Sequence, residues 1–430
     1  MYLGYFPEAW KIAKVIAIKK PGKDESLPSS YRPISLLPTL GKLFEKIILA
    51  RLKKATDKIL PNEQFGFRTG HSTAQQLARV AEHISHHLNL HESTGLILLD
   101  IEKAFDTVWH DGLLHKLIIC GVPLCIVKLI KSYLLGRKIA VHIGDTKSVY
   151  LFVEAGVPQG SILGPYLFLI FIYDVPIQPR TLLACFADDT ASYTSSKDID
   201  IVIGRLQFSL ELLQNFFTTW KLKLNESKTE AILFTRQRKL PKRLLNISGH
   251  SIPWSSSVKY LGVTLDAKLN WSKHVSQLRI KGAQAIGSLH PILNRRSSLS
   301  PHTKLRIYST LVRPCITYAC PVWSSTSNTN YQLLQTIQNK ALKIAYNTKF
   351  RTNLSNIHLE LKFPTLREFI LKLAHTFYQK NKTHYNTLIS SIARSKKEDL
   401  SYIDRYGTYR LPHHYLLFPT EHSDNQSNET

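Results

Sequence analysis

Three aspartates stand at positions where the chain otherwise has the apolar pattern of β-strands. Asp100 follows the apolar residues 96–99, and Asp188 and Asp189 follow the run 182–187. Carboxylates gathered at a hairpin tip and on a neighbouring strand repel one another unless a cation lies between them. Hard divalent cations prefer oxygen ligands, and two such ions about 4 Å apart can stabilise the attacking and leaving oxygens of a phosphoryl transfer. An Asp-Asp pair is also common in plain hairpin turns, so the pair alone leaves both interpretations open.

The elements that would have to position these carboxylates are buried strands. Residues 95–101 form a short and nearly all-apolar run, which is typical of a strand covered on both faces. Residues 182–194 predict a strand, a turn at 187–189 and a second strand. Further strands are predicted over 10–18 and 258–265, and apolar residues at helical spacing predict helices over 40–52, 77–88 and 162–173, the second with a capping box of Ser72 and Gln75.

The positive charge of the chain is concentrated in its last part. Of the formal net charge of +25, a surplus of +15 falls after residue 266, and residues 267–351 hold 13 Lys and Arg but no Asp or Glu. Basic groups neutralise phosphates and aromatic faces accept stacked bases, so this segment favours a nucleic-acid track. The alternative is a solvated helical surface with its aromatics in the core. The candidate cations are Lys268, Lys273, Arg279, Lys281, Arg295 and Arg296, and the interleaved aromatics are Trp271, Tyr308, Tyr318, Trp323, Tyr331 and Tyr346.

Composition excludes several classes of protein. A hydrophobic content of 43% is too high for a disordered basic tail. The longest apolar run, 162–173, is shorter than the roughly 20 residues of a membrane helix, and lysines interrupt the N-terminal segment, so we expect an intracellular protein without a membrane partner. The pairs Cys120/Cys125 and Cys315/Cys320 lack the spacing of zinc sites, and we expect them to be core thiols.

Short motifs surround the aspartates in a fixed order. They are 20–23 (KPGK), 30–37 (SYRPISLL), 64–68 (QFGFR), 99–106 (LDIEKAFD), 155–165 (AGVPQGSILGP), 186–189 (FADD), Leu224-Asn225 with Lys228, and 260–263 (YLGV). In order and spacing they resemble the motifs of reverse transcriptases. Two more, 108–113 (VWHDGL) and 318–323 (YACPVW), resemble those of the jockey group of non-LTR (LINE-like) retrotransposons. The resemblance covers about residues 5–350.

This resemblance implies an α+β fold, the right-hand polymerase. Residues 1–266 would form fingers and palm with an antiparallel palm sheet, and residues 267–350 an all-helical basic thumb. Residues 351–430 would form a C-terminal helical extension with a frayed tail. Nothing in the chain resembles an RNase H or the endonuclease of the jockey group, so we expect the polymerase part of a longer element.

The resemblance also implies a metal site and a proton donor. The metal ligands would be Asp100, Asp188 and Asp189, assisted by the carbonyl of Ile101, and they would hold two Mg²⁺ ions, with Mn²⁺ as an alternative. Lys228 would protonate the leaving pyrophosphate; the alternative for Lys228 is a solvated lysine in a turn.

Further residues would contact the nucleotide and the primer. Phe105 matches an aromatic gate that leaves no room for a 2′-hydroxyl, and its alternative is an ordinary core aromatic. Gln159 and Gly160 would lie beneath the incoming nucleotide and the template base, or else form a plain Gly/Pro loop. Arg32 with Lys19 or Lys20 would bind the triphosphate, and Phe186 and Ala187 would contact the primer end.

The predicted function is that of an RNA-directed DNA polymerase, which adds dNTPs to a primer 3′-OH on an RNA template and releases pyrophosphate. The expected partners are an RNA template, a DNA primer and the element RNA in a ribonucleoprotein, in nucleus and cytoplasm. The alternative is a catalytically inactive nucleic-acid-binding relic of a truncated element. A third reading, an RNA-dependent RNA polymerase, is disfavoured by Phe105 as the gate.

Overall fold

A central five-stranded sheet carries the three aspartates at one end in the computed structural model, which describes residues 4–237, 241–294, 296–347, 358 and 361–393. Its strands lie in the order β12 (Trp254–Ser255), β9 (Glu230–Phe234), β3 (Ser93–Leu99), β8 (Asp189–Ser196) and β7 (Leu182–Phe186). Strand β3 is antiparallel to both of its neighbours, and β7 and β8 form a hairpin. The buried strand and the strand-turn-strand unit are confirmed.

Strand β3 is apolar along its length because both of its faces are covered. Ile97 and Leu99 belong to one core with helix α6 (Ile199–Thr219), whereas Leu96 belongs to a second core with α2 (Thr73–Asn89). Side chains alternate between the two faces of a strand, so a strand between two helices needs apolar residues at every position. Burying each Leu or Ile contributes about 1.5–3 kcal/mol.

A second sheet lies near the N-terminus. Its strands are β2 (Tyr31–Leu36), β1 (Ile12–Lys19), β4 (Lys138–Ile143) and β5 (Thr146–Lys147), with β6 (Leu151–Phe152) paired to β4. The nearby helices are α1 (Thr39–Thr56), α3 (His110–Ile119), α4 (Leu124–Leu134) and α5 (Gly164–Phe171), and two 3-10 turns are η1 (Glu8–Trp10) and η2 (Pro28–Ser30). Buried residues of these helices share the first core with α6. The strand predicted over 10–18 is β1.

The C-terminal part is helical and packs on the second core. Its elements are α7 (Ser272–Ser288), α8 (His290–Leu293), α9 (Pro301–Ile307), a π-helical turn (Tyr308–Val312), α10 (Arg313–Ile316), α11 (Cys320–Trp323), α12 (Asn328–Ala345), α14 (Leu366–Asn381), α15 (Thr387–Ser390) and η5 (Ser391–Ala393). Trp271, Tyr308, Trp323 and Tyr331 are buried in that core. These four aromatics cannot stack on bases, so for them the alternative of a core position is correct.

Three sequence predictions need correction. The strand predicted over 258–265 is a hairpin of β13 (Ser257–Tyr260) and β14 (Val263–Asp266), because Leu261 and Gly262 both take positive φ angles, as two-residue hairpin turns require. Only half of the capping box forms, since Ser72 accepts from the backbone of Gln75 while the Gln75 side chain donates to Asn381.

The cysteine prediction is also wrong in part. Cys185 and Cys320 are buried and Cys120 is half-buried, but Cys125 and Cys315 are exposed. Both exposed cysteines lie on helices, where the apolar neighbours that suggested a core position belong to the opposite face.

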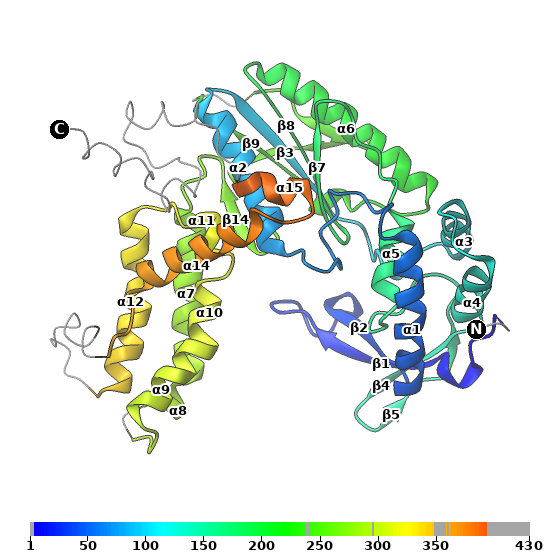
Figure 1. The fold of residues 1–430 in the computed structure, drawn as a ribbon, viewed down its shortest axis with the longest axis horizontal. Coiled ribbons are helices and arrows are strands. Elements are labelled where there is room, and N and C mark those ends of the chain that lie inside the picture. The colour runs from blue at the N-terminus through cyan, green and yellow to red at the C-terminus, as the bar shows by residue number, and fades with distance from the viewer. Residues whose placement is uncertain (1–3, 238–240, 295, 348–357, 359–360, 394–430) are drawn as a thin grey trace, which may run out of the picture.

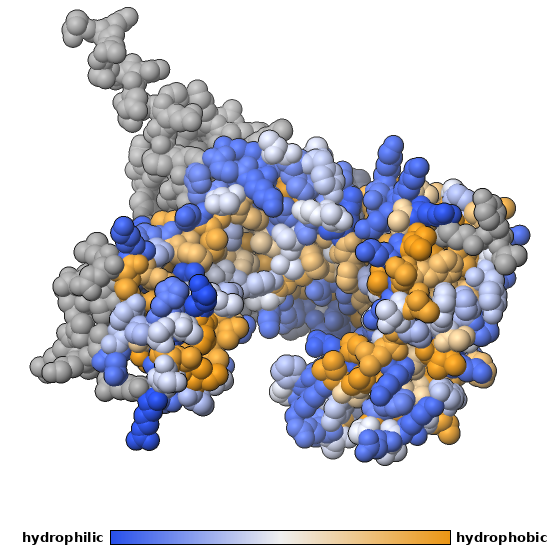
Figure 2. All heavy atoms as spheres, turned by 60° about the horizontal axis from the view of Figure 1, so that its bottom comes forward, coloured by the Kyte–Doolittle hydropathy of each residue, from blue (hydrophilic) through white to orange (hydrophobic). Residues whose placement is uncertain are grey.

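The two sheets and the C-terminal helices form an arch (Figure 1). The N-terminal sheet with α1 stands on one side of it, and α7 to α12 stand on the other. Figure 2 shows that the molecule is hollowed between these two lobes. Strand β3 runs toward this hollow in Figure 1.

In the part of the chain that the structure describes, no helix combines the length and the apolar content needed to cross a membrane. The remaining short strands, β10 (Leu245–Ile247) and β11 (His250–Ile252), form a separate hairpin.

Candidate active site

The three aspartates come together because two strands end at the same place. Leu99 of β3 pairs with Thr190 of β8, so Asp100 leaves β3 beside the point where Asp189 begins β8. Asp188 occupies the turn of the β7–β8 hairpin. A pocket of about 150 Å³ opens here, and its lining includes Asp100, Asp189, Lys228 and Lys259.

The electrostatics of this group favour a cation. Burial raises the pKa of Asp189 to about 6, and the negative charges of Asp188 and Asp100 add to this effect. The pKa of Asp188 is also raised, by burial first and then by the charge of Asp100. Carboxyl groups that resist ionisation in one another's presence ionise more readily when a positive charge binds between them.

Lys228 brings a positive charge to this group. It ends the 3-10 helix η3 (Glu226–Lys228), and its Nζ donates to Oδ2 of Asp100 over 2.8 Å. The backbone N–H of Asn225 donates to the carbonyl of Asp100 over 2.8 Å, which ties the η3 segment to the end of β3. Lys228 is therefore paired with a carboxylate while its side chain stays largely exposed, so its role stays a prediction.

The donor set suits a hard divalent cation, since it consists of carboxylate oxygens. Among the described residues, however, no three His, Cys, Asp or Glu side chains are arranged closely enough to hold a metal ion. Oδ2 of Asp100 is paired with the ammonium group of Lys228. The backbone of Ile101 bridges to Leu224, and the role of its carbonyl stays a prediction.

Phe105 lies five residues after Asp100, in the segment that follows β3. Its ring packs against Phe168 of α5 at a centroid distance of 4.8 Å and meets the edge of Phe67 at 5.9 Å. Its carbonyl accepts from the N–H of Val157 over 2.7 Å. Phe105 is half-buried, so the ring is both fixed by the core and partly accessible.

The glycine loop 156–160 fits between two backbone segments. Gly156 and Gly160 have φ angles of +88° and +114°, and an added Cβ would lie 2.6 Å from the carbonyl oxygen of Asp106 and 2.4 Å from that of Ser35, respectively. Only glycine tolerates both the conformation and the approach. Between them, Gln159 donates to Asp106 over 3.0 Å, and burial raises the pKa of Asp106. This loop therefore packs closely against the backbone of both β2 and the segment that contains Phe105.

The candidate triphosphate ligands lie at the tip of the β1–β2 hairpin. Lys19 forms an ion pair with Glu25, and Nζ of Lys20 donates to the carbonyl of Ser29 over 2.8 Å. Arg32 is exposed and pairs in register with Ile18. Lys19, the last residue of β1, pairs in register with Tyr31, and Lys20 follows the end of the strand.

The candidate track cations lie on the surface of the C-terminal helical part, and Arg295 lies outside the described residues. Lys268, Lys273, Arg279, Lys281 and Arg296 are all exposed. Lys273 donates to the hydroxyls of Ser256 and Ser257, each over 3.1 Å. At the aspartate turn, Phe186 is half-buried and Ala187 is buried.

Sequence reasoning missed two residues near the carboxylates. Lys259 and Glu230 line the same pocket as Asp100 and Asp189. Lys259 directly precedes the motif 260–263, and that adjacency was the one signal that could have singled it out.

Comparison with known proteins identifies the family. Residues 18–265 match the family model described as "Reverse transcriptase (RNA-dependent DNA polymerase)". This chain belongs to that family. The match spans β1 to β14, which includes the carboxylate group, the Phe105 segment and the glycine loop.

Relatives of this chain come from mobile elements. It is 37% identical over 403 residues to a probable RNA-directed DNA polymerase from transposon X-element of Drosophila melanogaster, covering 92% of this chain and 44% of that protein. It is 34% identical to the RNA-directed DNA polymerase from mobile element jockey of Drosophila funebris, covering 96% and 46%. The predicted resemblance to the jockey group is thus confirmed. The chain spans less than half the length of these relatives.

Proposed function

We propose that the chain is the RNA-directed DNA polymerase of a non-LTR retrotransposon. It adds dNTPs to a primer 3′-OH on an RNA template and releases pyrophosphate. The observation that carries the proposal is the convergence of Asp100, Asp188 and Asp189 at one end of the central sheet, where burial first and the neighbouring carboxylates second raise the pKa values of Asp188 and Asp189. Membership of the reverse transcriptase family supports the reaction class.

The carboxylates supply the cation-binding centre of the proposed reaction. Asp100, Asp188, Asp189 and the Ile101 carbonyl would hold two Mg²⁺ ions, or Mn²⁺, which when bound neutralise charge on the attacking and leaving oxygens. Lys228 keeps a proton beside Asp100 and delivers it toward the leaving pyrophosphate. A general acid in such a position contributes roughly 10²–10⁴-fold.

The residues around the pocket select and orient the nucleotide. Phe105, fixed between Phe67 and Phe168, excludes a 2′-hydroxyl. Gln159 and Gly160 form the surface beneath the incoming nucleotide and the template base. Arg32 with Lys19 or Lys20, near the tip of the β1–β2 hairpin, binds the triphosphate by charge-assisted hydrogen bonds. Phe186 and Ala187 contact the primer end.

In this proposal the chain divides into three parts. Residues 1–266 act as fingers and palm, with the central sheet as the palm. Residues 267–350 act as a basic thumb along the template–primer backbone, and residues 351–430 are a C-terminal extension. The exposed cations of residues 267–350 and the absence of acidic residues from 267 to 351 support the thumb assignment.

The proposed partners are an RNA template and a DNA primer, with dNTP as the substrate, within a ribonucleoprotein of the element RNA in nucleus and cytoplasm. Primer extension on an RNA template with Mg²⁺ tests the proposal. Incorporation of dNTPs is expected. A chain that binds the template–primer yet incorporates nothing would be an inactive relic and would refute the polymerase function.

A further inference from the structure

The residue before the aspartate pair has an unusual backbone conformation that something must hold in place. Ala187 has a φ of +58°, which costs a non-glycine residue on the order of 1 kcal/mol or more. The Gln64 side chain binds both polar groups of its backbone. Oε1 of Gln64 accepts from the N–H of Ala187 over 2.8 Å, and Nε2 donates to the carbonyl of Ala187 over 3.2 Å. Gln64 is 3% exposed, so water does not compete for these bonds.

The loop that carries Gln64 is seated directly on the aspartate hairpin. The N–H of Phe65 donates to the carbonyl of Cys185 over 2.9 Å, and the N–H of Cys185 donates to the carbonyl of Glu63 over 3.1 Å. An added Cβ at Gly66 would lie 2.1 Å from the backbone nitrogen of Ala187, so only glycine allows this approach. The loop thus pairs alongside the edge strand β7, next to the aspartate turn.

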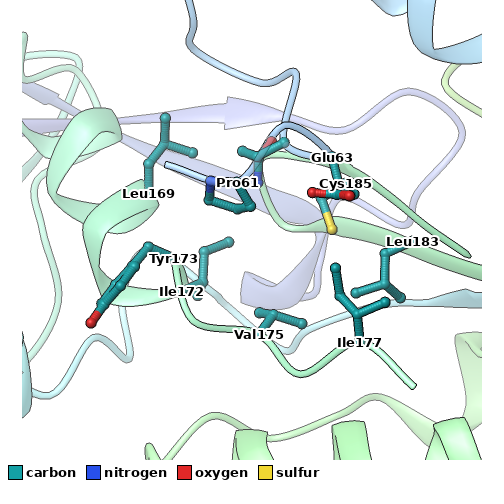
Figure 3. A pocket seen from close by; sticks show the side chains of 10 residues that line it. Pro61, Glu63, Leu169, Ile172, Tyr173, Val175, Ile177, Leu183 and Cys185 are labelled. Carbon is teal, nitrogen blue, oxygen red and sulfur yellow. The ribbon is translucent and has the colours of Figure 1, made fainter. Parts of the chain in front are cut away.

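The space behind this loop is filled. Figure 3 shows Pro61 and Glu63 of the loop beside Leu183 and Cys185 of β7, with Ile172 at the end of α5. The cavity that these residues line measures only about 10 Å³. This volume holds one water molecule at most, so the loop cannot relax inward without displacing α5 or β7.

A distant segment of the chain fastens the other end of the same loop. We call residues 381–386 the C-terminal strap; they join α14 to α15. Nδ2 of Asn386 donates to the carbonyl of Asn62 over 2.9 Å, and the hydroxyl of Tyr385 donates to the carbonyl of Thr69 over 3.1 Å. His71, whose ring packs on Phe65 at 5.0 Å, lies within hydrogen-bond distance of both Tyr385 and Asn386.

We propose that Gln64 is a positioning residue for Asp188 and Asp189, and that the C-terminal strap secures the loop that carries it. The inference rests on the proposed function, because the turn matters for catalysis through these two carboxylates. Without the Gln64 amide, the buried N–H groups of Gly66 and Ala187 and the carbonyl of Ala187 lose their partner. The turn is then free to leave its strained conformation. Misplacement of a reacting group by about 1 Å costs on the order of 10²-fold in rate.

The test compares Gln64→Met with Gln207→Met. Both remove a side-chain amide at similar volume, and Gln207 on α6 likewise binds both the N–H and the carbonyl of one residue, Asn246. Gln64→Met is expected to lower kcat by about 10²-fold and to leave the Kd for template–primer unchanged. It should also speed hydrogen exchange at the Ala187 amide, read from a peptide over 184–190. Gln207→Met should change neither kcat nor this exchange.

A milder variant guards against misfolding of Gln64→Met. Tyr385→Phe removes only the strap hydroxyl from a side chain that is 68% exposed, and kcat should fall about 3-fold, the value of a single neutral hydrogen bond. Tyr150→Phe, which removes an exposed hydroxyl bonded to Lys147, is the control. Unchanged exchange at Ala187 in Gln64→Met, or a kcat within 2-fold of the parent, would overturn the inference. If the parent chain itself incorporates no dNTP, the proposed function fails, while the exchange measurement still decides whether Gln64 holds the turn.

Discussion

Lys228 and Asp100 form an ion pair at the end of the central sheet, with 2.8 Å between Nζ and Oδ2. The pair joins the segment after α6 to the segment after β3, which are 128 residues apart in the sequence. It places an ammonium group directly beside the carboxylate of Asp100.

The first prediction concerns this ion pair. Lys228→Met is expected to lower kcat by roughly 10²-fold or more, because the leaving pyrophosphate loses its proton donor. The Kd for template–primer should stay the same, since the lysine is not part of the proposed track. Single-turnover incorporation and fluorescence anisotropy measure the two quantities. A variant with unchanged kcat would show that Lys228 only neutralises Asp100.

The second prediction follows from the raised pKa of Asp189. Its value of about 6, against an ordinary 3.8, means that the folded state binds an additional proton between those two pH values. The free energy of unfolding of the metal-free chain therefore falls as pH rises through this window. Asp189→Asn should be more stable than the parent at pH 7.5 by about 1 kcal/mol, after allowance for solvent screening.

Urea unfolding without divalent cations, at pH 7.5 and near pH 4, measures this difference. The gain should shrink toward pH 4, where Asp189 is protonated in the folded parent and begins to be protonated in the unfolded chain. Equal stability of the two chains at pH 7.5 would mean that neither burial nor the neighbouring carboxylates disfavour the ionised form of Asp189.

The third prediction concerns the sugar. Phe105→Ala is expected to raise kcat/KM for ribonucleotides relative to deoxyribonucleotides by about tenfold or more, because the ring no longer occupies the 2′ side. Phe67→Ala should have a smaller effect, since Phe67 only supports that ring from the side, with 5.9 Å between the two centroids. Phe208→Ala, on the exposed side of α6, is the control. Unaltered sugar discrimination in Phe105→Ala would remove the gate assignment.

The fourth prediction concerns salt. The logarithm of the association constant for a duplex falls linearly with the logarithm of the salt concentration. Each phosphate contact that is lost makes this slope less steep by about 0.9. Arg279→Ala and Lys281→Ala should each do so, whereas Lys197→Ala, at the far end of β8 from the carboxylates, should not. Binding to a primed template between low and high salt gives the slopes. Identical slopes for all three variants would argue against a track on α7.

Local pattern was enough to predict the main elements. The apolar run before Asp100 specified β3, because a strand covered on both faces leaves no other arrangement for such residues. The turn at Ala187-Asp188 followed from its flanking strands. The hairpin at Leu261-Gly262 was missed, since apolar residues continue from β13 through Leu261 into β14 with no polar residue to mark the turn.

Contacts between distant segments could not be predicted from one sequence. Nothing in the residues around Gln64 or Asn386 reveals that both meet near the aspartate turn, because such contacts depend on how the helices pack. The aromatics of 267–350 show the same limit. Burial of Trp271 and Tyr308 is decided by which helix face meets the second core.

The most direct test of the central claim is primer extension on an RNA template with Mg²⁺, with the parent chain and Asp188→Asn compared at saturating template–primer. We expect the parent to add dNTPs processively, and Asp188→Asn to bind with the same Kd but to incorporate at least about 10²-fold more slowly. Equal incorporation by the two proteins would contradict an active site built on these aspartates.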